Sequence, residues 1–246
     1  SLVANRAHLC QSDQDSLYPS FVDEAYDSAN QTLASDVEAV PLLWLALFRP
    51  QNLRTQTFEV DGEDITVEAP IVERAVALAQ LEESRPYLNS LFQSAGSLND
   101  YYAFLRQLLE SVAGKYITIE LQEVATLYED EQQFYDEVRA ALAAIGSPVN
   151  EEDQHRLMEI CQLPNNLKFP SARMYLDHLD YTDEDQWAFT RVLGAGQFGS
   201  IGIGKEVPWE CEDADFRFEL LPFDGDEDDD IDEDFDDDEE DDDDDD

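Results

Sequence analysis

The C-terminal end of the chain limits most strongly what can fold. Residues 224–246 contain 20 aspartates and glutamates in 23 positions, interrupted only by Gly225, Ile231 and Phe235. Such a run repels itself and has almost no apolar surface to bury, so we expect a disordered acidic tail. Folding is left to residues 1–223, which we expect to form a single globular domain. The chain is 43% hydrophobic and 11% aromatic, which is enough for a core of that size.

The charge of the whole chain excludes two classes of partner. There are 59 acidic residues and 14 basic ones, so the formal net charge is −45. Proteins that bind nucleic acid directly need clustered lysines and arginines to replace the counterions of phosphate. Anionic membrane surfaces also attract basic segments. We therefore expect neither of these partners and predict that the chain binds a basic protein.

Cysteine usage and hydropathy predict a cytoplasmic protein. Cys10, Cys161 and Cys211 are odd in number and widely spaced, which does not indicate a disulfide framework or a zinc site. We interpret them as reduced thiols. No apolar run is long enough to span a bilayer, and the first residues lack the apolar region of a secretory signal.

The spacing of apolar residues predicts an α+β fold, mostly α-helical with a β-hairpin and a few short strands. Short strands are expected at residues 3–9, 117–121 and 216–220. The hairpin is expected at residues 58–67, because Asp61 and Gly62 supply the positive φ angles of a tight turn. Residues 12–34 are rich in Ser, Asp, Asn and Tyr and are expected to be irregular.

Helices are predicted where apolar stripes follow capping residues. Ser35 is expected to cap a central helix that runs to about residue 47. Pro70 is expected to open a second helix, which Pro86 breaks or kinks. Further helices are expected to begin near Asn99, Asp130, Asn150, Ser171 and a capping box at Thr182–Asp185.

The motif with the strongest catalytic associations is the glycine-rich stretch Gly194–Gly199. It matches the G-x-G-x-x-G phosphate loop of protein kinases. That loop works only with a strand lysine, a catalytic aspartate and a metal-binding aspartate downstream, and only 46 residues follow Ser200. No helix and second parallel strand follow either, which argues against dinucleotide binding. We therefore interpret the stretch as a turn.

Metal and acid–base sites are also weakly supported. Asp224, Asp226 and Asp228 have the spacing of a calcium loop, but its sixth and twelfth positions hold Asp229 and Phe235 instead of Gly and Glu. His8, His155 and His178 have no partner at metal-ligand spacing. We predict no catalytic residue, no metal and no cofactor, and hence no enzyme. The enzymatic alternative would need a pocket at His178 or Cys10.

Acidic and aromatic residues provide the candidate partner-binding site. The segment 12–26 mixes both kinds, which is typical of a protein-binding loop, although a loop that tucks its aromatics into the core fits equally. An extended acidic chain also spaces its charges at about 3.3–3.6 Å, close to the phosphate spacing of one DNA strand. The predicted partner-binding residues are Asp13, Asp15, Tyr18, Asp23, Glu24, Glu129, Asp130, Glu131, Asp226, Asp228, Asp229, Asp230, Asp236, Asp237 and Asp238.

In size, charge, lack of a signal and mixed α-rich body, the sequence resembles the acidic immunity proteins that bacteria make against toxins. The resemblance implies a tight one-to-one complex in which the protein inhibits a toxin, often a nuclease domain, by covering its active or nucleic-acid-binding site. The alternative is a DNA mimic or a chaperone that binds many basic proteins by charge. Salt discriminates the two, because exposed charges are screened over about 8 Å at physiological ionic strength.

Overall fold

The computed structural model describes residues 5–17, 30–60, 62–147, 151–172 and 182–195. The expected acidic tail, the strand at 216–220 and most of the helix after Ser171 lie outside these ranges. The same holds for residues 196–199 of the glycine-rich stretch. The division of the chain into a domain at 1–223 and a tail therefore stays a prediction.

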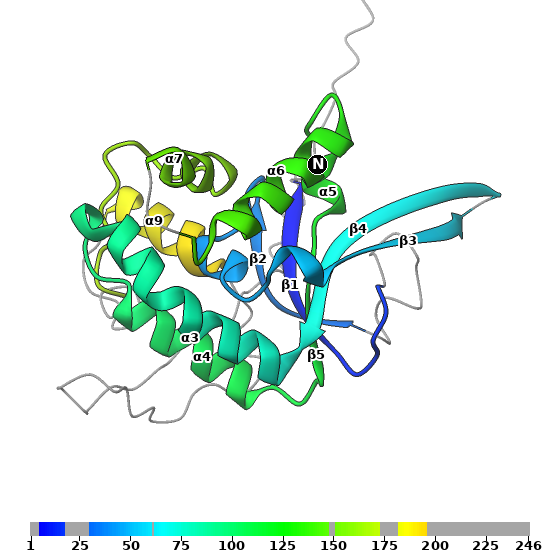
Figure 1. Ribbon diagram of the computed structural model, residues 1–246, viewed down its shortest axis with the longest axis horizontal. Helices are drawn as coiled ribbons and strands as arrows, with labels where there is room; N and C mark the ends of the chain where they lie inside the picture. Colours follow the sequence, from blue (N-terminus) through cyan, green and yellow to red (C-terminus); the bar gives the residue numbers. More distant parts are fainter. Residues whose placement is uncertain (1–4, 18–29, 61, 148–150, 173–181, 196–246) are drawn as a thin grey trace, which may run out of the picture.

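The centre of the fold is a five-stranded sheet in which every neighbouring pair is antiparallel. The strand order is β2-β1-β5-β4-β3 (Figure 1). β1 lies between β2 and β5. It carries an irregularity between Leu9 and Cys10, where its register with β2 shifts. The strands are β1 (Arg6–Ser12), β2 (Asn30–Val37), β3 (Leu53–Val60), β4 (Glu63–Glu73) and β5 (Tyr116–Glu120).

Helices gather beside the sheet, and α3 and α4 run next to each other along one side of the molecule (Figure 1). The predicted α+β class is confirmed, but the sheet is more extensive than the few short strands that the sequence led us to expect. The helical elements are α2 (Leu42–Leu45), η1 (Pro50–Asn52), α3 (Arg74–Leu91), η2 (Gln93–Ala95), α4 (Asn99–Ser111), α5 (Gln122–Ala125), α6 (Glu131–Ala144), α7 (Glu151–Ile160) and α9 (Asp183–Leu193).

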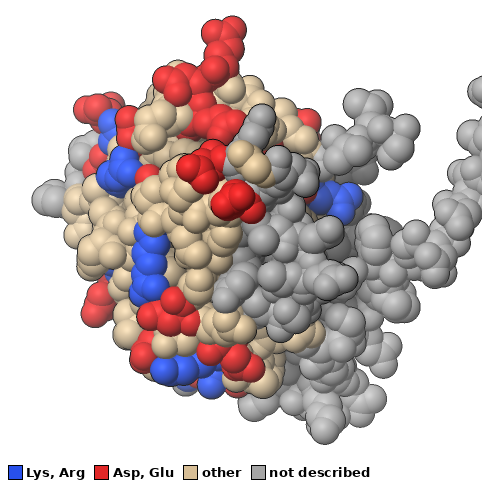
Figure 2. Space-filling model, turned by 90° about the vertical axis from the view of Figure 1, so that its right-hand side faces the viewer, with Lys and Arg blue, Asp and Glu red and all other residues tan. Residues whose placement is uncertain are grey.

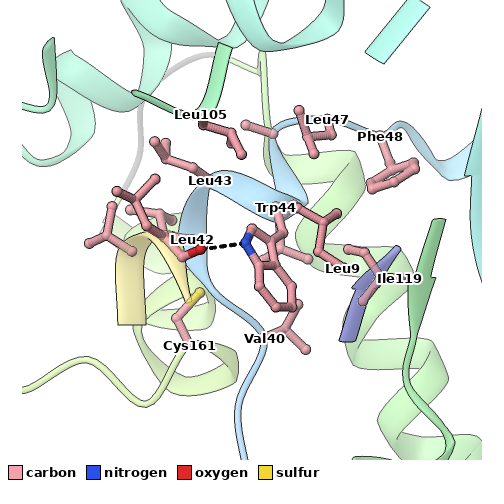
Figure 3. Close-up of a cluster of buried hydrophobic side chains, with 14 of the residues drawn as sticks. Leu9, Val40, Leu42, Leu43, Trp44, Leu47, Phe48, Leu105, Ile119 and Cys161 are labelled. Atoms are coloured by element: carbon pink, nitrogen blue, oxygen red, sulfur yellow. Dashed lines mark hydrogen bonds between the residues drawn. The ribbon is translucent and has the colours of Figure 1, made fainter. Parts of the chain in front are cut away.

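Trp44 lies at the centre of the hydrophobic core. Its side chain is fully buried among residues of α2, β1, β5 and α4 (Figure 3). Its indole Nε1 donates a hydrogen bond of 2.8 Å to the carbonyl oxygen of Leu193, which satisfies a polar group that would be costly to bury alone. Gly194 follows directly, with a φ of +81°, and a Cβ there would lie 2.3 Å from Trp44 Cζ2. The end of α9 is thus fitted closely against the indole.

The helix expected from Ser35 to residue 47 is wrong. Residues 30–37 form β2 instead, and only Leu42–Leu45 are helical. Glu38 has a φ of 61°, which turns the chain away from a helical path, and Pro41 precedes α2 with an extended ψ of 139°. The apolar run was correctly placed in the core, but pairing with β1 outweighs local helix propensity in its first part.

The helix predicted to open at Pro70 also begins too early. β4 continues through Pro70, which lies opposite Leu53, and its last residues, Ile71–Glu73, pair with β5. α3 begins only at Arg74 and passes through Pro86 to Leu91. The proline removes one backbone donor, but buried Tyr87, Leu88 and Leu91 hold the following turn in the core.

The hairpin and two helix starts are confirmed. Gly62 in the hairpin turn has a φ of +86°. Asp130 accepts a hydrogen bond from the backbone N–H of Gln132, and Thr182 and Asp185 form the expected capping box. Asn99 differs, because Leu98 is the N-cap of α4 and Asn99 is its first residue.

Candidate partner-binding surface

The feature that stands out from the body is the hairpin of β3 and β4. β4 pairs with β3 through Glu63–Pro70 and with β5 only through Ile71–Glu73. Residues 53–70, which we call the arm, therefore project beyond the rest of the sheet as a two-stranded ribbon (Figure 1). A two-stranded ribbon is only marginally stable in water, so it needs support from its neighbours.

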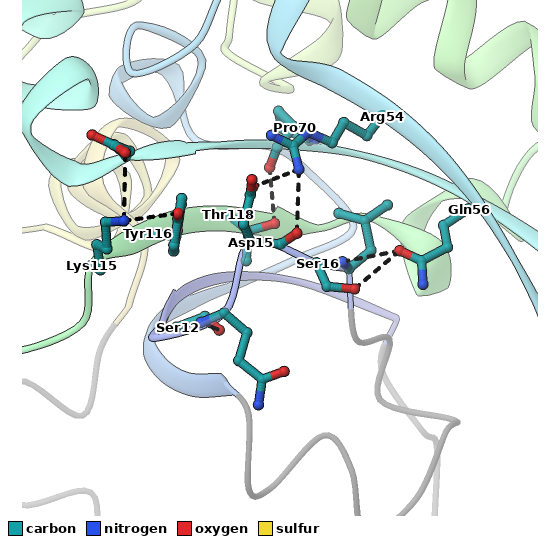
Figure 4. A network of polar contacts seen from close by, with 12 residues as sticks. Ser12, Asp15, Ser16, Arg54, Gln56, Pro70, Lys115, Tyr116 and Thr118 are labelled. Atoms are coloured by element: carbon teal, nitrogen blue, oxygen red, sulfur yellow. Dashed lines mark hydrogen bonds and ion pairs between the residues drawn. The ribbon is translucent and has the colours of Figure 1, made fainter.

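The segment Asp15–Leu17 supports one face of the arm. Leu17 is 3% exposed and packs against Ala69 and Ile71. The hydroxyl of Ser16 and the backbone N–H of Leu17 both donate to Gln56 Oε1, at 3.2 and 3.3 Å (Figure 4). Asp15 Oδ1 lies 2.5 Å from Arg54 Nη1. This contact places Asp15, a predicted binding residue, at the base of the arm in an ion pair.

Helix α6 supports the opposite face. Glu68 on β4 points to this side, with its side chain only 12% exposed, and its carboxylate lies 2.5 Å from Arg139 Nη2. Arg139 also contacts Asp136 on its own helix at 2.6 Å. The hydroxyls of Thr57 and Thr66 share a hydrogen bond of 3.1 Å across the ribbon. The arm is therefore fixed to the body from both faces near its base.

Replacing Glu68 by glutamine is expected to lower the free energy of unfolding by about 1 kcal/mol, because the amide loses the charge-assisted bond to Arg139. Urea titration of the full chain measures this change. The matched control is Glu110→Gln, which breaks an exposed pair with Arg106 and should cost about 0.5 kcal/mol or less. An equal loss in both variants would contradict the anchoring role of Glu68.

Exposed carboxylates occur at the end of the arm and at the start of α6. At the end of the arm, Glu59 and Asp64 flank the turn, and we call them the arm-tip acids. Glu129, Asp130 and Glu131 form a second exposed group, the corner acids, at the start of α6. Figure 2 views the molecule from the side toward which the arm projects and shows acidic side chains at its top, near its centre and toward its lower edge, with Lys and Arg side chains among them. Leu127, which is 48% exposed, lies beside the corner acids in the chain.

Most Lys and Arg side chains in the described part of the molecule form ion pairs with carboxylates of the same chain. Arg54 and Arg139 are held by the arm, as described above. Lys115 Nζ lies 3.6 Å from Glu73 and donates to the hydroxyl of Tyr116 at 3.1 Å (Figure 4). Further ion pairs with neighbouring acids hold Arg49, Arg85, Arg106 and Arg156. These ion pairs neutralise most of the positive charges of the described residues. The remaining exposed carboxylates therefore make the surface potential negative.

The structure describes only some of the predicted binding residues. Asp13 is exposed beside the arm's supporting segment, and Asp15 is exposed but paired. Asp130 caps α6, and Glu131 accepts a hydrogen bond of 3.2 Å from Gln122 Nε2. Outside the described ranges lie Tyr18, Asp23, Glu24, Asp226, Asp228, Asp229, Asp230, Asp236, Asp237 and Asp238.

Sequence reasoning missed the arm-tip acids, Glu59 and Asp64. The predicted hairpin at residues 58–67 covers both residues but assigns no binding role to them. The signal was present, because acidic residues flank Asp61 and Gly62 on both sides, and a tight turn exposes its flanking side chains.

A buried ion pair ties β2 to α9. Arg191 Nη1 lies 3.0 Å from Asp36 Oδ2, and the two side chains are 3% and 7% exposed. Arg191 also donates to the carbonyl oxygen of Val37, and its guanidinium stacks 3.9 Å from the ring centroid of Trp187. Burial raises the pKa of Asp36 to about 6, although the attraction of Arg191 works in the opposite direction. This pair connects elements that are distant in the chain.

The groups with catalytic potential are embedded in the fold. Cys10 and Cys161 are fully buried, and burial raises the pKa of the Cys161 thiol, so it stays protonated at neutral pH. His8 Nδ1 lies 2.8 Å from the hydroxyl of Ser35 on the neighbouring strand. His178 lies outside the described ranges. Neither described cysteine has the exposure that a reactive thiol requires.

A hollow of about 720 Å³ lies between residues 164–168 and the first turns of α9. Trp187, which is 44% exposed, and Lys168 line it together with Glu184 and Asp185. The Asp185 carboxylate accepts hydrogen bonds from both the backbone N–H and the hydroxyl of Thr182, so it is committed to the start of the helix.

Within the described ranges, no group of three or more histidines, cysteines or carboxylates is arranged to hold a metal ion. None of the helices found there has the length and apolar character needed to cross a membrane. Comparison with known proteins gives no match to a family model, a curated protein or a solved structure.

Proposed function

We propose that the chain is an acidic inhibitor of the immunity type, which binds a basic protein such as a toxin or nuclease domain and covers its active or nucleic-acid-binding site. The arm and the corner acids are the described part of the contact surface. They present exposed carboxylates to a partner, and Leu127 adds an apolar group beside them. A few apolar anchors within a charged rim are typical of protein interfaces.

One observation carries this proposal. The described arginines are largely consumed in local ion pairs, whereas carboxylates stay exposed on a projecting hairpin that is fixed to the body from both faces. An arm that is fixed at its base limits the positions that its tip charges can take, which favours shape-specific docking. A net charge of −45 also accelerates encounter with a basic surface.

A DNA mimic or a chaperone for many basic proteins is the second candidate. The run of 20 acids in residues 224–246 favours it, because such a run attracts any basic protein by charge alone. The two proposals differ in their response to salt. Binding by charge alone falls steeply as salt rises, whereas a shaped interface with an apolar centre persists.

Affinity capture with the full chain tests the proposal. A lysate of the source organism is passed over the immobilised protein, washed at low and high salt, and the retained proteins are identified by mass. We expect one basic protein to survive the high-salt wash. The double variant Glu59→Gln with Asp64→Asn should then weaken the affinity for that protein by about tenfold or more, because it removes both arm-tip charges.

The matched control removes two exposed acids at the beginnings of α7 and α9, in the variant Glu151→Gln with Glu184→Gln. It loses the same net charge and should change the affinity by about twofold or less. Equal weakening by both variants would mean that net charge alone drives binding. Recovery of many basic proteins, all released by salt, would exclude the inhibitor and favour the charge mimic.

A further inference from the structure

We propose that the free edge of β3 binds an extended, basic segment of the partner polypeptide as an additional antiparallel or parallel strand. This inference rests on the proposed function and specifies how the partner is held. It assigns recognition to the backbone of the arm in addition to its acidic side chains. Strand addition to an exposed sheet edge is a common way of binding a peptide.

The position of β3 in the sheet is the first argument. β3 is the last strand in the order β2-β1-β5-β4-β3 and pairs along its whole length with β4. In an antiparallel ladder, alternate residues of an edge strand direct their N–H and C=O groups away from their partner. Among the described residues, no backbone hydrogen bond is formed on that outer side of Leu53–Val60.

The supporting segment leaves this edge uncovered. Ser16 and Leu17 bind the side chain of Gln56 and not the backbone of β3. Leu17 packs over Ala69 and Ile71, which belong to β4. The described part of the segment thus lies across a face of the ribbon, while α6 meets the other face through Glu68.

The sequence of β3 lacks the usual protection of an edge strand. Natural edge strands are commonly blocked by lysine, proline, a bulge or short length. β3 has eight residues, Leu-Arg-Thr-Gln-Thr-Phe-Glu-Val, and its register with β4 is unbroken. Its one cation, Arg54, is neutralised by Asp15 at 2.5 Å. The middle of the strand therefore presents a regular and uncharged edge.

Charge identifies the occupant as basic. Glu59 and Asp64 lie directly opposite each other near the tip, and both are exposed. A strand with lysine or arginine opposite Glu59 would pair with that carboxylate while its backbone pairs with β3, and Asp64 adds negative charge one strand further in. A second copy of this chain is disfavoured, because each copy carries a net charge of −45.

The test uses the full chain and a defined probe, a capped eight-residue peptide of alternating lysine and valine. A twin peptide carries N-methyl groups at every second residue, which keeps the charge but removes the donors needed for strand pairing. Amide hydrogen exchange is measured for each segment with and without peptide. With the unmodified peptide, we expect amides of Leu53–Val60 to exchange about tenfold more slowly, whereas α4 amides stay unchanged.

The outcomes separate this inference from the proposed function. Protection of β3 by the unmodified peptide alone supports edge pairing. Equal protection by both peptides, or by neither, overturns edge pairing, while capture of a single basic protein at high salt would still support the inhibitor. Sedimentation of the chain alone is the final control. A dimer with β3 amides already protected would assign the edge to a second copy and also overturn the inference.

Discussion

Replacing Gly194 by alanine is expected to lower the free energy of unfolding by about 3–4 kcal/mol, one of the two largest effects that we predict. Two costs combine at this position. The φ of +81° is unfavourable for any residue with a side chain, and the new Cβ would lie 2.3 Å from Trp44 Cζ2. Trp44 cannot move away freely, because it is fully buried and its Nε1 is bonded to Leu193.

Gly146→Ala is the matched control for this variant. Gly146 follows the C-cap of α6 with a φ of +85°, but no atom of the described residues lies within 4 Å of a Cβ added there. It therefore carries the backbone cost alone, about 1 kcal/mol. Urea unfolding of both variants, followed by tryptophan fluorescence and by circular dichroism, gives the comparison. Equal losses would show that the contact with Trp44 has no energetic role.

Replacing Arg191 by methionine is the second large effect. The variant should lower the free energy of unfolding by about 3–4 kcal/mol at pH 8, because it leaves the Asp36 carboxylate buried without its cation. Methionine keeps much of the apolar volume of the arginine stem, so the loss reports mainly on charge. The stacking of the guanidinium on Trp187 is lost as well.

This loss should shrink to about 1–2 kcal/mol at pH 5. In the folded wild type, the pKa of Asp36 is about 6, above the ordinary value of 3.8. The folded state therefore binds the proton more tightly than the unfolded chain, and stability from this group increases as pH falls from above 6 to below 3.8. Removing Arg191 withdraws the main influence that lowers the pKa of Asp36, so the carboxyl is neutral at pH 5 and no longer needs a cation.

Arg106→Met serves as the control for the pH comparison. Arg106 pairs with Glu110, whose side chain is 50% exposed, so its removal should cost about 1 kcal/mol or less at either pH. Thermal and urea unfolding at pH 8 and pH 5 measure the free energy of unfolding of both variants. An equal loss in Arg191→Met at the two pH values would contradict the role of the buried pair.

Local signals in the sequence predict several elements well. Asp61 and Gly62 indicate the hairpin, and Asp130 and Thr182 indicate the starts of α6 and α9, because each acts within a few residues of itself. β2 was missed, because its strand character comes from pairing with β1 and not from its own composition. The prediction of a helix start at Pro70 is wrong for a similar reason, because Pro70 lies in β4, which pairs with β3 and β5.

The candidate surface was predicted only in outline. Acidity alone pointed to a basic partner and to Asp13, Asp15 and the corner acids. It could not show that Asp15 is paired with Arg54, 39 residues away, or that Arg139 holds Glu68, 71 residues away. Such pairings depend on the register of the arm and on the position of α6, which no local pattern contains. The arm-tip acids form a surface only because the ribbon projects beyond the rest of the sheet.

The sheet order has a consequence for the sequence of events during synthesis. β3 and β4 are neighbours in the chain, so the arm can form as soon as both have left the ribosome. β1 must wait for β5, because its residue His8 pairs with Glu120. At translation rates of about 5–20 residues per second, that delay is about 5–20 s. The pair of β1 and β2, and after it the arm, are thus available early, and the centre of the sheet closes last, after a loop of more than 100 residues has been drawn together.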